Sequence, residues 1–218
     1  IPVIRGVDLE AKGGEISVLL GSNGAGKTTF LESLSGIIPA RAGFITLDGT
    51  ALVKLRPGAR AKAGLSHVEQ GRTVFPAMTT EENLKVALHP DADLKEAYDL
   101  FPELLQRRNV EAGMLSGGEQ QMVVIARSIV NRPRVILIDE MSSGLAPVIV
   151  SRLMRAVRQL ADDGMAVVLV EQFAALALAI GNRAYVLRRG QIVYDGDCAA
   201  LARDPGHLHR LYLGDAAA

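Results

Sequence analysis

The chain has 218 residues, and its 24 lysine and arginine residues balance 24 aspartate and glutamate residues, so the formal net charge is zero. This length predicts one large domain, or one domain with a small insert. A neutral chain gives no general attraction for nucleic acid or anionic lipid, and its single cysteine, Cys198, excludes an internal disulfide framework and a thiolate zinc cage.

The hydropathy of the chain indicates whether it spans a membrane or carries a secretory signal. No segment reaches the ~20 apolar residues that a membrane span needs, because the most apolar region, Ala166–Ile180, is interrupted by Glu171 and Gln172. No secretory signal is visible. The chain begins at Ile1 instead of methionine, so we expect that an N-terminal piece is missing. The sequence therefore predicts a soluble, intracellular chain that is able to dock on a membrane protein.

The first third of the chain alternates apolar runs with one helical run. Ile16–Leu20 predicts a buried strand, and Phe30–Leu34 predicts a helix soon after it. Phe44–Leu47 predicts a strand that ends at the turn dipeptide Asp48-Gly49. Gly64–Val68 predicts the strand that follows.

The pattern changes between Phe75 and Pro133, where no run typical of a buried strand occurs. Three helices are predicted there: one opened by the capping box Thr79–Glu82 and running to about Leu88, one over Asp93–Leu105 that Pro102 kinks or ends, and one over Ser116–Asn131. We therefore expect residues 76–133 to form a small helical subdomain, inserted between residues 1–75 and 134–218 of an α/β core.

The last third returns to alternation. Val135–Ile138 and Ala166–Val170 read as nearly continuous Val, Ile and Leu, as fully buried parallel strands do. The other predicted elements are an amphipathic helix over Ala146–Leu160, a helix over Phe173–Ile180 ended by Gly181 as its C′ residue, and a hairpin of Ala184–Leu187 with Gln191–Tyr194. Strands that alternate with helices predict a parallel α/β sheet.

A phosphate-binding loop lies between the first strand and the first helix. The pattern G-x-x-x-x-G-K-[ST] is complete, and the residues concerned are Gly21, Ser22, Asn23, Gly24, Ala25, Gly26, Lys27, Thr28 and the following Thr29. Glycines let the backbone wrap around phosphate oxygens, and the helix N-terminus adds partial positive charge. Lys27 is expected to reach the β- and γ-phosphates, and Thr28 to offer its hydroxyl to Mg²⁺.

Two carboxylates follow the buried strand Val135–Ile138. Ligands bind at the carboxyl ends of strands in open α/β sheets. Asp139 fits the Mg²⁺-side carboxylate of a phosphate-loop enzyme, and Glu140 is placed to polarise an attacking water.

A second glycine-rich segment, Leu115–Gln121, reads Leu-Ser-Gly-Gly-Glu-Gln-Gln. Ser116 and Glu119 form a capping box, so the segment could merely begin a helix. A cap does not need Gly117 and Gly118, however, since each glycine lowers helix stability by about 1 kcal/mol. Exposed N–H groups at a helix start also bind anions, which predicts a second phosphate-facing surface.

Taken in chain order, the motifs Gly21–Thr28, Leu115–Gln121 and Val135–Glu140 resemble those of the ATP-binding subunit of ABC transporters, and the resemblance covers essentially the whole chain. It implies a P-loop (RecA-like) parallel sheet core with an N-terminal antiparallel β subdomain and a small helical insert, all in one domain over residues 1–218. It also implies ATP and Mg²⁺ as cofactors. In that family two ATPase subunits pair head to tail, so Ser116, Gly117, Gly118 and Glu119 would serve the partner's nucleotide.

Further roles follow from the resemblance, position by position. Gln70 matches the glutamine that touches Mg²⁺ and the attacking water, Asp139 the Mg²⁺ aspartate, and Glu140 the general base. Ser142–Pro147 matches the loop that crosses the dimer interface. Gln172 stands where the family usually has histidine; glutamine can donate to a γ-phosphate but cannot become cationic.

Several short segments are similar to one branch of the family, which imports branched-chain amino acids, urea or short amides. They are Gln70–Arg72, Gly144–Pro147, Val170–Gln172 and Tyr212–Asp215. Within that branch the chain resembles the second of two different ATPase subunits. This implies a second ATPase subunit, transmembrane permease subunits and indirectly an external solute-binding protein as partners, no nucleic acid, and a peripheral place on the cytoplasmic face of the inner membrane.

Three other readings remain open on the sequence. A non-transport ABC ATPase acting on DNA or ribosomes typically carries coiled-coil inserts, tandem cassettes or basic linkers, which this chain lacks. A phosphate-loop small-molecule kinase gives no reason for Leu115–Gln121. A weak or regulatory ATP switch is suggested by Gln172, although Lys27, Gln70 and Glu140 favour retained activity.

Overall fold

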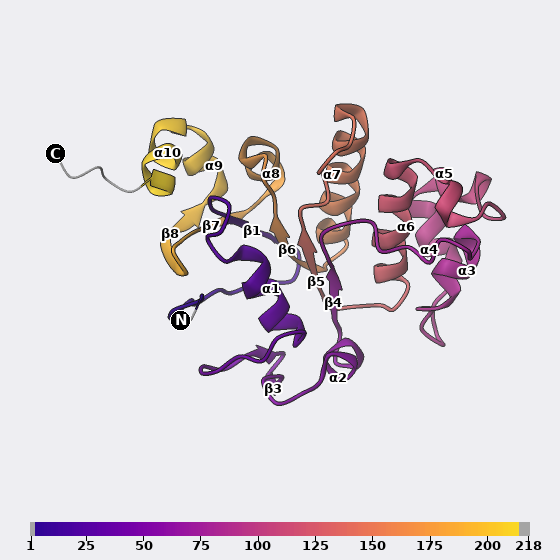
Figure 1. The fold of residues 1–218 in the computed structure, drawn as a ribbon, viewed down its shortest axis with the longest axis horizontal. Helices are drawn as coiled ribbons and strands as arrows, with labels where there is room; N and C mark the ends of the chain where they lie inside the picture. The colour runs from indigo at the N-terminus through magenta and orange to yellow at the C-terminus, as the bar shows by residue number, and fades with distance from the viewer. Residues whose placement is uncertain (1–2, 214–218) are drawn as a thin grey trace.

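The computed structural model describes residues 3–213, and its centre is a six-stranded sheet in the order β4-β5-β6-β1-β7-β8 (Figure 1). The strands are β1 (Ile16–Leu20), β4 (Leu65–Val68), β5 (Val135–Asp139), β6 (Ala166–Val170), β7 (Arg183–Arg188) and β8 (Gln191–Asp197). All neighbours are parallel except β7 and β8, which form the expected C-terminal hairpin. The predicted parallel α/β sheet is confirmed.

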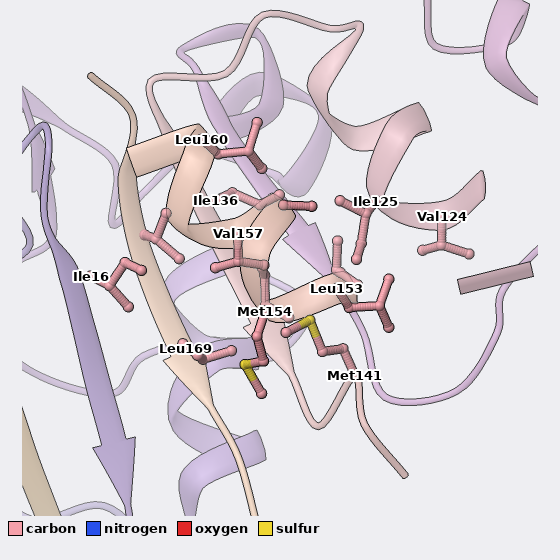
Figure 2. Close-up of a cluster of buried hydrophobic side chains, with 14 of the residues drawn as sticks. Ile16, Val124, Ile125, Ile136, Met141, Leu153, Met154, Val157, Leu160 and Leu169 are labelled. Atoms are coloured by element: carbon pink, nitrogen blue, oxygen red, sulfur yellow. The ribbon is translucent and has the colours of Figure 1, made fainter. Parts of the chain in front are cut away.

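Each central strand is buried on both faces, so its side chains divide between two cores. In β5, Ile136 and Ile138 join the larger cluster, whereas Leu137 between them joins the smaller one. This division explains why the strands read as continuous apolar runs instead of alternating ones. Figure 2 shows the larger cluster where Leu153, Val157 and Leu160 of one helix pack on the sheet residues Ile136 and Leu169.

Helices cover both faces of the sheet (Figure 1). On one face lie α6 (Gly117–Ile129), α7 (Pro147–Asp162), α8 (Ala174–Ile180), α9 (Cys198–Ala202) and α10 (Pro205–Leu213). On the other lie α1 (Lys27–Ser35) and α2 (Pro57–Lys62). The helices α2, α9 and α10 were not predicted, because each is short or lacks a sustained apolar periodicity.

The segment between β4 and β5 is helical, as the sequence predicts, but its helices are shorter than expected. They are α3 (Thr80–Lys85), α4 (Leu94–Leu100), α5 (Pro102–Gln106), a 3₁₀ turn over Ala112–Met114, and α6. The helix expected over Asp93–Leu105 is divided into α4 and α5, and of the two effects predicted for Pro102, a kink or an end, the structure shows an end. Pro102 begins α5, and Phe101 before it has φ −131° and ψ 79°, because proline disfavours the helical region for its predecessor.

The expected strand Phe44–Leu47 is reduced to β2 (Thr46–Leu47), which pairs with β3 (Thr50–Ala51) in a small antiparallel sheet. The turn between them is Asp48-Gly49, with φ of 46° and 78°. Positive φ at both central residues is typical of the two-residue hairpin turn that this dipeptide favours. Phe44 lies outside the strand with 85% of its surface exposed.

Gly181 ends α8, but not in the left-handed conformation expected of a C′ residue; its φ is −80°. The glycine is required by packing instead. A Cβ there would lie 2.4 Å from Val18 Cγ2 and 2.7 Å from Cys198 Sγ. The absence of a side chain therefore lets α8 approach β1 closely.

Within residues 3–213, no helix has the length and apolar character to cross a membrane. Of the predicted branch segment Tyr212–Asp215, the last two residues lie outside the described part of the chain.

Candidate nucleotide site

The phosphate loop joins the end of β1 to the start of α1, and its glycines have steric reasons. Gly24 and Gly26 have φ of 79° and 106°, in the region that glycine favours. A Cβ on Gly21 would lie 2.4 Å from the Leu187 carbonyl oxygen, and one on Gly26 would lie 2.8 Å from Ile4 Cδ1. The loop can follow this path only with glycine at these positions.

Lys27 is held inside the loop that precedes it. Only 6% of the residue is exposed, and its Nζ donates to the carbonyl oxygens of Gly21 at 2.9 Å and Ser22 at 3.3 Å. An ammonium bonded to carbonyl oxygens and to no carboxylate is available to an anionic ligand. This arrangement suits binding of phosphate groups.

Asp139 ends β5 and is 1% exposed, yet neither of its carboxylate oxygens has a hydrogen bond of normal geometry in the described structure. Burial raises the pKa of this carboxyl; the nearby Thr28 hydroxyl offsets this in part, and the charge of Glu140 adds to it. Buried carboxylates are normally paired or bound to a metal. The two Asp139 carboxylate oxygens, which lie near the Thr28 hydroxyl, therefore suit the binding of a divalent cation.

No cluster of three or more His, Cys, Asp or Glu side chains within residues 3–213 could hold a metal by itself. Mg²⁺ in nucleotide sites is usually bound by one or two protein oxygens together with substrate phosphates and water. The donors here, a carboxylate with a hydroxyl near it, are of the hard oxygen type that Mg²⁺ prefers.

Glu140 and Gln70, which are 70 positions apart, meet directly. The Gln70 Nε2 donates to Glu140 Oε2 at 2.8 Å. Glu140 has φ +48°, which is uncommon for a non-glycine residue, and its backbone N–H donates to the Val170 carbonyl at 2.9 Å. The two residues that sequence reasoning assigned to the attacking water thus lie together at the ends of β4 and β5.

The second glycine-rich segment begins α6, and its capping box is present in both directions. The Glu119 amide donates to Ser116 Oγ at 3.3 Å, and the Ser116 amide donates to Glu119 Oε2 at 2.9 Å. Burial tends to raise the pKa of Glu119, but hydrogen bonds from Ser116 and Arg107 outweigh it, so the pKa is lowered. The Glu119 carboxylate therefore accepts hydrogen bonds from the Ser116 amide of the cap and from Arg107.

Gly117 and Gly118 face different neighbours. A Cβ on Gly117 would lie 2.6 Å from the Arg72 guanidinium, and one on Gly118 would lie 2.7 Å from Ile149 Cγ2. Ser116 is exposed. Helix α6 and the phosphate-loop helix α1 lie on opposite faces of the sheet (Figure 1), so the structure does not unite the two glycine-rich segments in one site within a chain.

Gln172 follows β6, next to the end of β5, and its side chain is exposed. Sequence reasoning missed the residue before it. Glu171 is 1% exposed, and its Oε2 accepts from Ser142 Oγ at 2.5 Å. The signal was a carboxylate that interrupts an apolar run. Arg72 was also missed as a site residue; its guanidinium donates to the Ser143 carbonyl at 3.4 Å, beside Gly117.

A wide hollow of about 1790 Å³ lies away from these residues. It is lined by residues 3–4, 6–11 and 38–48 and by the sheet face that carries Leu137 and Val168. Of the phosphate loop only Thr29 borders it, and Lys27, Asp139 and Glu140 do not. Size alone is therefore a poor guide here, and the charged groups at the strand ends mark the site.

Comparison with known families decides the class of the protein. The family model described as ABC transporter matches residues 4–143. The chain belongs to the ABC transporter ATP-binding family. Members of this family bind ATP, and this chain is accordingly an ATPase, the nucleotide-hydrolysing subunit of an ABC transporter. Such subunits work with permease and ATPase partners.

This ABC ATPase has named relatives along nearly its full length. It is 40% identical over 220 residues to the high-affinity branched-chain amino acid transport ATP-binding protein BraG of Pseudomonas aeruginosa, covering 98% of this chain and 94% of that one. It is 34% identical over 201 residues to a probable branched-chain amino acid transport protein, LivF, of Archaeoglobus fulgidus, covering 89% and 85%. It is also 34% identical over 221 residues to the lipopolysaccharide export ATP-binding protein LptB of Escherichia coli, covering 98% and 91%.

Solved structures agree on the fold of the ABC ATPase. A nucleotide-free ATP-binding cassette from an ABC transporter superposes with a TM-score of 0.85 at 22% identity, covering 98% of this chain and 93% of that one. An ATP-binding subunit of another ABC transporter gives 0.82 at 24% identity, covering 97% and 92%. At such identities the likeness shows the fold alone.

Proposed function

We propose that this ABC ATPase energises an importer of branched-chain or other hydrophobic amino acids. The observation that supports the solute class is the 40% identity to BraG over 98% of the chain. Urea or short-amide import by the same branch is the alternative, and the 34% identity to LptB makes export of a lipid-linked solute a further one. The subunit would lie on the cytoplasmic face of the inner membrane.

The proposed site is built around the phosphate loop. Residues Gly21–Thr29 would wrap the phosphates with their amide N–H groups, and the Lys27 ammonium, 6% exposed, would move from the loop carbonyls to the β- and γ-phosphates. Thr28, Gln70 and Asp139 would hold Mg²⁺, whose bound charge neutralises that of the phosphates. The buried Asp139 carboxylate oxygens, which have no hydrogen-bond partner among the described residues, support the role of Asp139 as a Mg²⁺ ligand.

Glu140 is the proposed general base. Its carboxylate accepts from Gln70 Nε2 at 2.8 Å, so the two side chains together could orient a water and take its proton. Gln172, at the end of the neighbouring strand, would donate its amide N–H to the γ-phosphate. Ser116–Glu119 of a second subunit, paired head to tail, would complete each site. The exposure of Ser116, and the place of α6 across the sheet from α1, support a site shared between two chains.

The first test is Glu140→Gln. The amide cannot accept the proton, so turnover should fall about 100-fold or more, whereas ATP binding through the phosphate loop should persist. Single-turnover hydrolysis and nucleotide binding measure the two effects separately. Glu111→Gln, which changes an exposed glutamate in the helical segment, is the control. Wild-type turnover in Glu140→Gln would show that the general-base assignment is wrong.

The solute is tested by uptake in cells that lack this chain. Labelled leucine and labelled urea are offered to cells that carry the wild-type chain, Glu140→Gln, or neither. Leucine uptake that requires the wild-type chain, with urea uptake unchanged, supports the proposal. Normal leucine uptake in the cells without the chain contradicts it.

A further inference from the structure

A buried carboxyl that the proposed reaction does not use lies at the end of β6. Glu171 is 1% exposed and follows five buried apolar residues. Its Oε1 has no hydrogen-bond partner among the described residues. A buried carboxyl is unfavourable unless its bonding capacity is met, and an apolar side chain would fit the strand better. The chemistry of Glu171 is therefore expected to serve a purpose beyond packing.

The strongest bond of Glu171 leads to the segment after Glu140, and the backbone N–H groups of Ser142 and Gln172 also donate to its carboxylate. Its Oε2 accepts from Ser142 Oγ at 2.5 Å, and Ser142 is itself 3% exposed. The residue before Glu171 makes a second link, since the Val170 carbonyl accepts from the Glu140 amide at 2.9 Å. Two successive residues at the end of β6 thus hold the chain on either side of the Glu140 side chain.

Glu140 needs such restraint. Its φ of +48° lies in the left-handed region, which is unfavourable for a residue with a Cβ because that atom comes too close to the following carbonyl oxygen. A strained backbone of this kind persists only where its surroundings hold it. The conformation directs the Glu140 carboxylate to Gln70 Nε2, 2.8 Å away.

We propose that Glu171 is a positioning residue for the catalytic base: through its hydrogen bond with Ser142 it keeps Glu140 in the left-handed conformation that presents the carboxylate to Gln70. The inference rests on the proposed role of Glu140. Without the bond, residues 140–142 lose a restraint, Glu140 relaxes toward negative φ, and its carboxylate leaves Gln70. The phosphate loop is untouched, so chemistry slows while ATP still binds.

Steady-state ATPase kinetics of four variants test this. Ser142→Ala removes the donor, and Glu171→Met removes the acceptor at similar volume; each should lower kcat about tenfold and leave KM for ATP within about twofold. Glu171→Gln keeps an oxygen acceptor for Ser142 and should retain most of the wild-type kcat. The double variant Ser142→Ala/Glu171→Met should be no slower than Glu171→Met alone, because the methionine already removes the acceptor of the Ser142 hydroxyl.

Ser17→Ala is the matched control. Ser17 is also buried, at 1% exposed, and its hydroxyl donates to the Glu10 carbonyl at 3.2 Å, far from Glu140 in the chain. It should lower the melting temperature as Ser142→Ala does and leave kcat unchanged.

Three outcomes would overturn the proposal. They are a wild-type kcat in Ser142→Ala together with a lowered melting temperature, a loss in Glu171→Gln as large as in Glu171→Met, and additive losses in the double variant. Failure of the proposed function is a different result, since Glu140→Gln would then hydrolyse ATP at the wild-type rate whatever Ser142→Ala does.

Discussion

Most of the buried side-chain atoms that lack a hydrogen bond lie at one edge of the sheet. In the described residues, the buried side-chain atoms without a hydrogen bond are both oxygens of Asp139, Oε1 of Glu171, and Nε2 of His67. Folded proteins leave few such atoms. Three of the four belong to carboxylates at the ends of β5 and β6, beside Glu140. Asp139, the proposed metal ligand, is thus among the groups that the fold alone leaves without a hydrogen bond.

Asp139→Asn should separate stability from function. Burial raises the pKa of Asp139, so at neutral pH the folded protein must hold a charge that the unfolded chain holds more easily. The neutral amide removes that penalty and should stabilise the metal-free protein by about 1 kcal/mol. The same change should abolish Mg²⁺-dependent hydrolysis.

Urea unfolding without Mg²⁺ or nucleotide, and ATPase assays with Mg²⁺, measure the two effects of Asp139→Asn. Asp163→Asn, at an exposed position, is the control for both. A destabilised Asp139→Asn variant would contradict the stability argument, and an active one would contradict the metal assignment.

Substitutions of Gln172 test whether ATP hydrolysis needs the histidine that the family usually has at this position. Because its side chain is exposed, Gln172→Ala should leave the melting temperature unchanged and lower turnover, whereas Gln172→His should keep a donor and remain active. Turnover and thermal unfolding of both variants are compared with wild type. If neither substitution alters the rate, Gln172 does not act at the γ-phosphate.

At the scale of elements, the same capping motif opens two helices with different demands. Thr79 and Glu82 cap α3, and Ser116 and Glu119 cap α6, both with reciprocal hydrogen bonds. Only α6 has two glycines after its cap. Gly118 is buried against Ile149, which is a packing reason, whereas Gly117 meets only the flexible end of the exposed Arg72 side chain.

Gly118→Ala and Gly117→Ala should therefore differ. The added methyl of Gly118→Ala would overlap Ile149 and should destabilise the protein by about 1–3 kcal/mol. Arg72 can move aside in Gly117→Ala, so stability should be unchanged or slightly higher.

A lower ATPase rate in the stable Gly117→Ala variant would support a glycine kept clear for the partner's nucleotide. Denaturant unfolding and ATPase assays on both variants provide the comparison. Wild-type activity in Gly117→Ala would argue that this glycine has no role at the dimer interface.

At the scale of the whole molecule, His67 makes folding sensitive to acid. Its Nδ1 lies 3.0 Å from Ser35 Oγ, linking β4 to the end of α1, and burial lowers its pKa from 6.5 to about 4. Between pH 6.5 and about 4, the His67 imidazole binds a proton in the unfolded chain but stays neutral in the folded protein. Stability should therefore be complete above pH 6.5 and fall as the pH drops toward 4.

His67→Asn should reduce this pH dependence. Urea unfolding of the variant and of wild type at pH 7 and pH 4.5 gives the comparison, with the exposed His209→Asn as control. The free energy of unfolding should fall less for His67→Asn than for wild type between the two values. Equal losses in the two proteins would show that other groups dominate.

Much of the fold and site was predictable because local patterns carry it. Strand β6 was predicted with its exact bounds, and the expected hairpin, helical segment and both capping boxes are present. Short runs of Val, Ile and Leu that alternate with helical patterns favour buried strands, and caps are local hydrogen bonds. The split at Pro102 was harder, because the sequence could not distinguish a kink from a break.

The sequence by itself determined the chemistry: a phosphate loop, a strand-end pair at Asp139 and Glu140, and a capped glycine-rich helix each depend on residues a few positions apart. Only the tertiary structure decided which distant residues meet. The bond of Gln70 to Glu140 spans 70 positions and that of Ser142 to Glu171 spans 29. Such contacts arise because parallel strands from separate parts of the chain end at the same edge, which no local pattern encodes.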